Sequence, residues 1–247
     1  MTTGARIDKD PDYCRILANL QEHFVEVPAE CPYGLPYVAI YRQARFGDML
    51  DGLMAQMLFS GYRRNGNVIY AMCCMGCTEC VPIRLHTAEF RPNRNQRRVA
   101  RRNIDLAVEV APLEMNKENL ALLDKFLKVR YPGRSSSAVD YYAGFFLNNF
   151  QNSLEIRFRS PEGELLGVSI IDLGRQWLNA VYFYFDPDAA KRSLGTYNIL
   201  YLVDFCRQQN IDILYLGYWI KDVPAMKYKE AFRPHELLVG GSWISSF

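Results

Sequence analysis

Apolar residues recur along the chain in two periods, one typical of helices and the other typical of strands. In segments 46–61 and 120–131 they fall every three or four positions, which predicts two amphipathic helices. A third is expected at 196–209, with Cys206 on its inward face, an aromatic helix at 141–150, and a polar helix or loop from 94 to 103. Predicted strands are 68–72, 81–85, 105–110, 154–159, 165–172, 177–185 and 211–220. The mixture predicts an α+β (α/β) fold.

The order of elements in the last third of the chain is informative for chemistry. The strand at 177–185 is followed by a loop of the pattern Arg-x-x-Gly at 192–195, and then by the helix at 196–209. A buried strand at 211–220 and a helix-like segment at 226–232 complete the unit. This order is typical of an acyl-transfer core. A helix N-terminus after a strand offers free backbone N–H groups to an anion or a carbonyl oxygen.

The size of the chain leaves room for one large domain or two small ones, since it has 247 residues. Hydrophobic residues make up 49% and charged residues 23%, the balance of an ordinary globular protein. No apolar run is long enough to span a bilayer, and the N-terminal residues lack the apolar stretch of a secretory signal. We therefore expect a cytoplasmic protein with no membrane partner. Two domains are predicted, an N-terminal one at 1–110 and a C-terminal one at 111–247, with a loop or hinge at 132–137.

The predicted N-terminal domain is marked by its cysteines, four of which lie within eight positions. Cys74, Cys77 and Cys80 are separated by two residues each. Cytosolic cysteines are reduced, so the clustering favours a metal over disulfides. With Cys31 as the fourth thiolate, the set suits a [4Fe–4S] cluster or tetrahedral Zn²⁺, and Cys73 is a substitute ligand. The overlapping Cys-x2-Cys spacings are more typical of a cluster loop.

A run of arginines without any acidic residue lies between 91 and 102. The guanidinium group binds phosphate oxygens through two N–H groups, so the run favours nucleic acid over a merely solvated face. In a helix, Arg94, Arg98 and Arg101 would share one face. The spacing does not distinguish tRNA from rRNA or DNA. The predicted nucleic-acid-binding residues are Arg91, Arg94, Arg97, Arg98, Arg101 and Arg102.

The loop 192–197 resembles the pyrophosphate-binding loop of GNAT-fold acetyltransferases, whose pattern is Gln/Arg-x-x-Gly-x-Gly/Ala. Gly195 matches the first glycine, but Tyr197 stands where the second small residue belongs. A large ring there obstructs close approach of the backbone to a pyrophosphate. The pattern therefore predicts a GNAT-like acyltransferase core that does not use CoA, preceded by the cysteine-rich N-terminal module.

Motifs from residue 31 onward resemble the arginyl/leucyl-tRNA–protein transferase family, and most closely its short bacterial branch. The matching segments are Cys-Pro-Tyr at 31–33, Gly-Tyr-Arg-Arg at 61–64, the cysteine loop and Val-Pro-Ile-Arg at 74–84, Asn-Gln-Arg-Arg at 95–98, Arg-Arg-Asn at 101–103, Asp-Pro-Asp at 186–188, 192–197, and Leu-Gly-Tyr-Trp-Ile at 216–220. The resemblance implies a GNAT-like aminoacyltransferase linked to iron–sulfur or zinc binding. It also implies transfer of leucine from leucyl-tRNA to the α-amine of proteins that begin with Asp or Glu, which marks them for degradation. The arginine run would then bind tRNA.

The implied reaction turns an ester into an amide, so positioning and oxyanion stabilisation can supply most of the catalysis. The attacking α-amine has a pKa of about 8, and a weak base suffices. We expect backbone amides at 195–197, or splayed strand ends beside them, to bind the oxyanion, and an aspartate to hold or deprotonate the amine. The predicted catalytic residues are Asp186, Asp188, Gly195, Thr196 and Tyr218. The predicted substrate-binding residues are Arg192, Ser193, Tyr197, Lys227, Tyr228 and Lys229.

Several alternatives stay open at this point. Asp188 is equally suited to a strand-ending turn or a helix cap. An arginyl donor would need a buried acid in its pocket, whereas the aromatic residues of 141–150 and 181–185 favour leucine. Two further alternatives are a CoA-dependent N-acetyltransferase and a non-catalytic, metal-containing RNA-binding protein.

Overall fold

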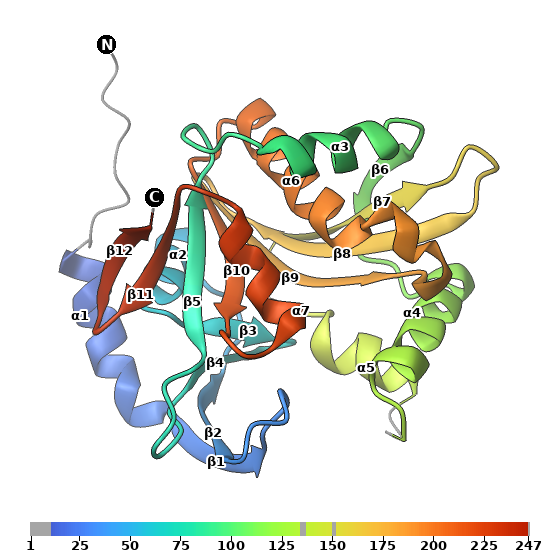
Figure 1. The fold of residues 1–247 in the computed structure, drawn as a ribbon. Helices are drawn as coiled ribbons and strands as arrows, with labels where there is room; N and C mark the ends of the chain where they lie inside the picture. Colours follow the sequence, from blue (N-terminus) through green and yellow to red (C-terminus); the bar gives the residue numbers. More distant parts are fainter. Residues whose placement is uncertain (1–10, 134–136, 150–151, 247) are drawn as a thin grey trace.

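The molecule is built around an eight-stranded sheet in the order β12-β11-β5-β10-β9-β8-β7-β6 (Figure 1). The computed structural model describes residues 11–133, 137–149 and 152–246. All neighbouring strands are antiparallel except the parallel pair β9 and β10. The strands are β5 (Val81–His86), β6 (Ala107–Pro112), β7 (Asn152–Arg159), β8 (Leu165–Leu173), β9 (Trp177–Phe185), β10 (Ile213–Trp219), β11 (His235–Val239) and β12 (Ser242–Ser246).

A smaller antiparallel sheet of four strands, in the order β1-β2-β4-β3, lies beside the main one. Trp177 and Tyr215 of the main sheet pack in one apolar cluster with Ile69 of β4 and Met57 of α2, which ties the two sheets together. Its strands are β1 (Val25–Glu30), β2 (Val38–Arg45), β3 (Arg63–Asn65) and β4 (Val68–Met72).

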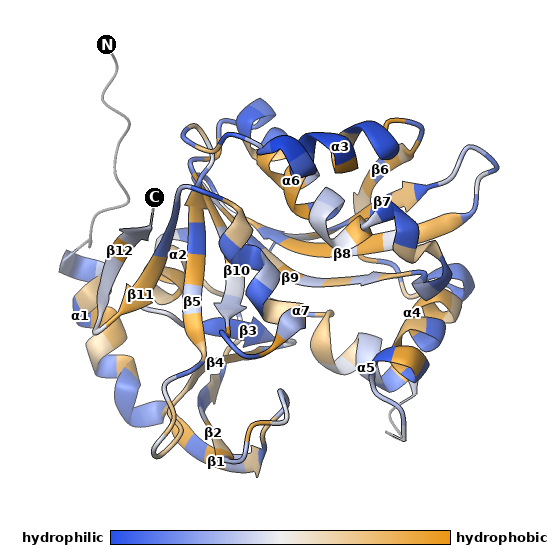
Figure 2. Cartoon of the chain, in the orientation of Figure 1, coloured by the Kyte–Doolittle hydropathy of each residue, from blue (hydrophilic) through white to orange (hydrophobic). Residues whose placement is uncertain are grey.

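Helices cover both faces of the main sheet. One core places Leu202 and Val203 of α6 against β5, β7 and β10, and a second places Leu123 and Phe126 of α4 against Val168 of β8. β8 between them is buried at every residue but its last. Figure 2 shows the hydrophilic outer surface of α3, above α6. The helices are α1 (Pro11–Leu20), α2 (Asp51–Phe59), α3 (Arg94–Arg102), α4 (Lys117–Arg130), α5 (Ala138–Phe145), α6 (Leu194–Gln208) and α7 (Pro224–Lys227), with 3-10 turns η1 (Gln21–His23), η2 (Pro187–Arg192) and η3 (Tyr228–Ala231).

The mixed α/β class is confirmed, whereas the expected boundary between two domains at residue 110 does not coincide with a break in the sheet. The boundary at residue 110 falls inside β6. Moreover, β5, which precedes that boundary, pairs with β10 and β11, which follow it. The two expected domains therefore share one sheet. Of the predicted hinge at 132–137, residues 134–136 lie outside the described residues, as does residue 150 of the predicted aromatic helix.

Among the residues that the structure describes, no helix is both long and apolar enough to cross a membrane.

Candidate functional site

The central feature of the site is the place where β9 and β10 diverge. The two strands pair in parallel from Ile213 to Tyr215, where Tyr215 lies opposite Asn179. Beyond that point the described residues of β9 run on to Phe185 without pairing to β10. A register shift against β5 follows Tyr215, and Gly217 has φ +76°, a conformation that favours glycine. The splayed strand ends expected from the sequence are therefore present.

Two cationic side chains meet at this opening. Lys229 of η3 is buried, and its Nζ donates to the carbonyl oxygen of Tyr218 at 2.7 Å. Arg63 of β3 donates from its guanidinium to the carbonyl oxygen of Gly217 at 3.2 Å. Burial, and then the charge of Arg63, lowers the pKa of Lys229 to about 7. The predicted neighbours Lys227 and Tyr228 remain on the exposed side of the same turn.

Tyr218, on β10, lies next to Arg63. Its ring centroid is 5.6 Å from Cζ of Arg63 and 6.4 Å from the ring of Tyr70 on β4. Burial raises the pKa of its hydroxyl, so Tyr218 stays neutral. The ring is thus one side of an aromatic wall around Arg63, and the catalytic role expected of Tyr218 stays a prediction.

The Asp-Pro-Asp segment ends β9 with an ion pair across to α4. Nζ of Lys125 lies 2.5 Å from Oδ1 of Asp186 and 2.8 Å from Oδ2 of Asp188. Asp186 also accepts from the backbone N–H of Asp188 and so caps η2. Both aspartates have a structural partner, and a role in chemistry stays a prediction for each.

The predicted oxyanion donors need a correction. Ser193 is in the left-handed region, with φ +54°, and its carbonyl oxygen accepts from the N–H groups of Thr196 at 3.0 Å and Tyr197 at 3.1 Å. These two amides close the first turn of α6 and are not free to bind a carbonyl oxygen. Gly195 lies in the same turn, and a Cβ added there would sit 3.9 Å from the Tyr228 hydroxyl. The diverging strand ends are the better candidates for this task.

The start of α6 joins the basic helix α3 through Arg192. Its guanidinium pairs with Asp105 at 2.8 Å, and its carbonyl oxygen accepts from Asn103 at 2.8 Å. A hollow of about 670 Å³ opens here, with Arg102 and Lys191 among its lining residues. Arg192 therefore lies beside a basic surface and away from Lys229, and it neutralises an acid of its own chain.

The arginine run, which the sequence left open as a polar helix or loop, forms the helix α3 from Arg94 to Arg102. Asn93 caps α3, because its side chain accepts from the backbone N–H of Gln96. The side chain of Gln96 in turn accepts from the backbone N–H of Asn93. Gln96 is buried and donates to the carbonyl oxygen of Ala231, which fixes α3 beside η3. All six arginines of the run are exposed. None of them forms an ion pair with a carboxylate of the described residues.

The cysteine segment lies between β4 and β5 and faces the aromatic wall around Arg63. Burial raises the pKa of Cys80 to about 12, with the nearby thiols of Cys74, Cys31 and Cys77 contributing to the shift. The four predicted ligands thus share one neighbourhood, while Cys73 is exposed. Among the described residues no three Cys, His, Asp or Glu side chains converge closely enough to hold a metal ion. Metal binding therefore stays a prediction. Cys206, by contrast, is confirmed as a core residue.

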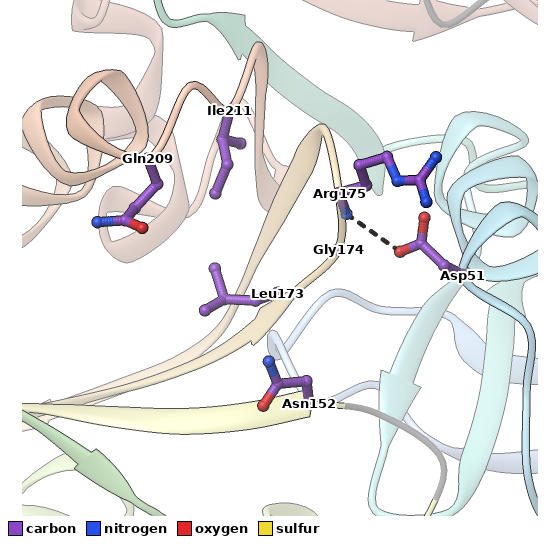
Figure 3. Close-up of a pocket in the computed structure, with 7 residues that line it drawn as sticks. All are labelled: Asp51, Asn152, Leu173, Gly174, Arg175, Gln209 and Ile211. Atoms are coloured by element: carbon purple, nitrogen blue, oxygen red, sulfur yellow. Dashed lines mark hydrogen bonds between the residues drawn. The ribbon is translucent and has the colours of Figure 1, made fainter.

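A second hollow, of about 450 Å³, lies at the opposite end of β9, beside the β8–β9 turn (Figure 3). Asp51 accepts there from the backbone N–H of Arg175 at 3.3 Å. None of the predicted site residues lines it. The hollow is therefore separate from the opening between β9 and β10.

Sequence reasoning missed Arg63, Lys125 and Asp105 as members of the site. Arg63 lies in the segment Gly-Tyr-Arg-Arg, which marks the family resemblance without indicating a role for the residue. The sequence signal was only the pair of adjacent arginines at 63 and 64, whose burial on the short strand β3 the structure reveals. Lys125 and Asp105 are single charged residues on polar surfaces, and nothing in the sequence marks their partners.

Comparison with known proteins gives the family. Residues 29–98 and 118–239 match the family models described as arginine-tRNA-protein transferase, N terminus and C terminus. The chain is 40% identical over 185 residues to the aspartate/glutamate leucyltransferase of Nitrosococcus oceani, covering 74% of this chain and 78% of that one. With the protein of the same name from Chromobacterium violaceum, identity is 37% over 223 residues, covering 87% and 91%. This chain belongs to the arginine-tRNA-protein transferase family.

Solved structures with similar folds are more distant. L-PGS from Bacillus licheniformis superposes with a TM-score of 0.44 at 16% identity, covering 72% of this chain and 52% of that one. FemX superposes with a TM-score of 0.43 at 7% identity, covering 80% and 76%.

Proposed function

We propose that this protein transfers leucine from leucyl-tRNA to the α-amino group of proteins that begin with Asp or Glu, in the cytoplasm, and so marks them for degradation. The observation that carries the proposal is the membership in the arginine-tRNA-protein transferase family, with relatives named aspartate/glutamate leucyltransferase along most of the chain. The divergence of β9 and β10 supports a GNAT-like core, with the cysteine segment as its N-terminal module.

The donor is proposed to be leucyl-tRNA because the described interior offers no spare acid for an arginyl side chain. Only Glu155 and Asp172 are buried acids among the described residues. Arg157 pairs with Glu155, which also accepts from Asn119 and Tyr142, and Asp172 is paired in the same way with an arginine. An arginyl side chain would need an unpaired carboxylate, whereas a leucyl side chain needs apolar walls.

Aromatic walls of that kind come from α5 and β9. The ring of Tyr182 lies 5.7 Å from that of Tyr141 and 5.3 Å from that of Phe146. Tyr184 stacks on Phe146 with the ring centroids 5.9 Å apart. The two aromatic segments that favoured leucine in the sequence thus form one cluster, beside the end of β9.

Aminolysis of the aminoacyl ester is downhill, so the protein has mainly to place two substrates. The exposed arginines of α3 would hold the tRNA backbone, and the opening beyond Tyr215 would receive the ester carbonyl and the acceptor amine. At neutral pH a fraction of the acceptor α-amine is already deprotonated, since its pKa is about 8.

The experiment is a transfer assay with radiolabelled leucyl-tRNA or arginyl-tRNA and an acceptor peptide that begins with Asp. We expect label in the peptide from leucyl-tRNA. Transfer of arginine alone would keep the reaction class and change the donor. Binding of tRNA without any transfer would favour a non-catalytic RNA-binding protein, and acetylation of the peptide from acetyl-CoA would favour an N-acetyltransferase.

We also propose that Cys31, Cys74, Cys77 and Cys80 hold a [4Fe–4S] cluster or Zn²⁺, with Cys73 as a substitute ligand. The shared neighbourhood of the four thiols supports the set, because such a site needs four thiolates within a few ångströms. Elemental analysis of protein purified without oxygen should find one site's worth of metal per chain, and about none in Cys77→Ser. Equal metal in both proteins would exclude this ligand set. Cys206→Ser is the control, since Cys206 lies in the core.

A further inference from the structure

Arg63 is a buried cation without a carboxylate partner among the described residues. Its guanidinium donates only to neutral carbonyl oxygens, those of Leu58, Tyr62 and Gly217, at 3.4, 2.6 and 3.2 Å. Its Nε is buried and has no hydrogen-bond partner within the described chain. Burial lowers its pKa, and the surrounding tyrosines oppose that shift.

Lys229 is the second cation in the same position. Its Nζ bonds to the carbonyl oxygen of Tyr218 at 2.7 Å and lies 3.7 Å from the sulfur of Met226. No carboxylate of the described residues forms an ion pair with Lys229 or Arg63. Two basic side chains thus lie together in the interior, where holding both in their charged forms costs free energy unless an anion binds.

The other buried arginines of the described chain differ from this pair, because each of them has a carboxylate partner. Arg64 pairs with Asp172 at 2.7 Å, Arg84 with Glu236 at 2.6 Å, and Arg157 with Glu155. In each case a carboxylate of the same chain neutralises the charge, as buried charges require. Arg63 and Lys229 have no such partner among the described residues, and an anion from outside the described chain would supply one.

We propose that Arg63 and Lys229 form the site that binds the side-chain carboxylate of the acceptor's first residue, Asp or Glu. The inference rests on the proposed function and names the residues that select the acceptor. The backbone is open toward the ammonium group beside Gly217, where an added Cβ would meet a single neighbour within 4 Å, the Lys229 Nζ at 3.8 Å. The same glycine lies just beyond the last pair of β9 and β10, next to the opening where the α-amine must react.

A carboxylate suits this place better than a tRNA phosphate. The rings of Tyr215 and Tyr218 each lie 5.6 Å from Cζ of Arg63, and both side chains are buried. A small terminal carboxylate can enter such a space, whereas a phosphodiester is flanked by two riboses and suits the exposed arginines of α3. The lowered pKa of Lys229 fits an empty anion site, since a bound carboxylate would restore the ammonium form.

The test compares peptides that begin with Asp and with Asn, which have nearly the same shape and differ in charge. In wild type we expect a clear preference for Asp in kcat/KM. Lys229→Met should reduce that preference on the order of tenfold to a hundredfold, chiefly by raising KM for the Asp peptide. Lys229→Arg should restore a fraction of it. Lys221→Met, the same change at an exposed lysine, is the matched control and should leave the preference unchanged.

The outcomes distinguish a failure of the proposed function from a failure of the proposed recognition site. If wild type transfers no leucine to either peptide, the proposed function fails. If wild type prefers Asp and Lys229→Met keeps that preference undiminished, the proposed function stands and the recognition site is overturned.

A second measurement needs only the wild-type protein. Calorimetric titrations at pH 8, in buffers of different ionisation enthalpy, measure the protons taken up on binding. Binding of the Asp peptide should take up close to one proton more per peptide than binding of the Asn peptide. Burial keeps the facing tyrosines protonated at that pH, and Arg63 stays charged. The facing tyrosines are Tyr33, Tyr70, Tyr215 and Tyr218. Equal proton uptake for the two peptides would overturn the inference.

Discussion

Replacing Arg64 with Met is expected to lower the free energy of unfolding by about 3–5 kcal/mol. Arg64 donates from Nε and from one terminal nitrogen to the two carboxylate oxygens of Asp172, each at 2.7 Å. Both side chains are fully buried. The variant leaves Asp172 charged in the interior with only Ser153 and Asn179 as described donors. Arg64 also bonds to the carbonyl oxygen of Phe146, so its loss releases the end of α5 from β3.

Urea denaturation of both proteins measures this loss. The double variant Arg64→Met, Asp172→Leu should regain much of the stability, because it removes the stranded carboxylate as well. Arg159→Met is the control: its pair with Glu118 is partly exposed, so the expected loss is below about 1 kcal/mol. A loss of similar size in Arg64→Met and Arg159→Met would contradict the structural account of the buried pair.

Replacing Arg94, Arg98 and Arg101 together by Gln is expected to weaken tRNA binding on the order of tenfold to a hundredfold at low salt. The three side chains are exposed on one helix and are not paired with a described carboxylate, so their charge is available to phosphate. The slope of log K against log salt should become shallower by about 2–3, since each lost phosphate contact removes about one unit.

The matched control carries the same loss of charge elsewhere, in Arg15→Gln, Arg45→Gln and Arg130→Gln, all of which are exposed. Filter binding of leucyl-tRNA at several salt concentrations measures both proteins. Equal slopes for the two triple variants would mean that net charge, and not α3, governs binding, and would remove α3 from the interface.

Elements with strong local signals were predictable from the sequence. The strands β4 and β9 have the predicted bounds, because each is an apolar run rich in β-branched or aromatic residues. The edge strands β1 and β12 were missed, since most of their residues are exposed and neither is a buried apolar run. The shared sheet was also missed, because the pairing of β5 with β10 joins residues far apart in the chain.

The candidate site was only partly predictable. The family motifs located the segments 186–188 and 192–197, and helical spacing indicated the arginine face of α3. Lys229 was among the predicted substrate-binding residues. The pairing of Lys125 with Asp186, and the meeting of Arg63 with Lys229, depend on how α4 and β3 pack against distant strands. Sequence spacing has no information on such contacts. The amides of Thr196 and Tyr197, which the loop pattern had indicated as oxyanion donors, are engaged because the left-handed Ser193 turns its carbonyl oxygen onto them.

The most direct measurement of the central claim is transfer of radiolabelled leucine from leucyl-tRNA, in competition with unlabelled arginyl-tRNA, to peptides that begin with Asp, Glu or Ala. Our account predicts label in the Asp and Glu peptides, none in the Ala peptide, and little effect of arginyl-tRNA. Equal labelling of all three peptides would contradict it. So would the loss of leucine label from the Asp and Glu peptides when arginyl-tRNA competes.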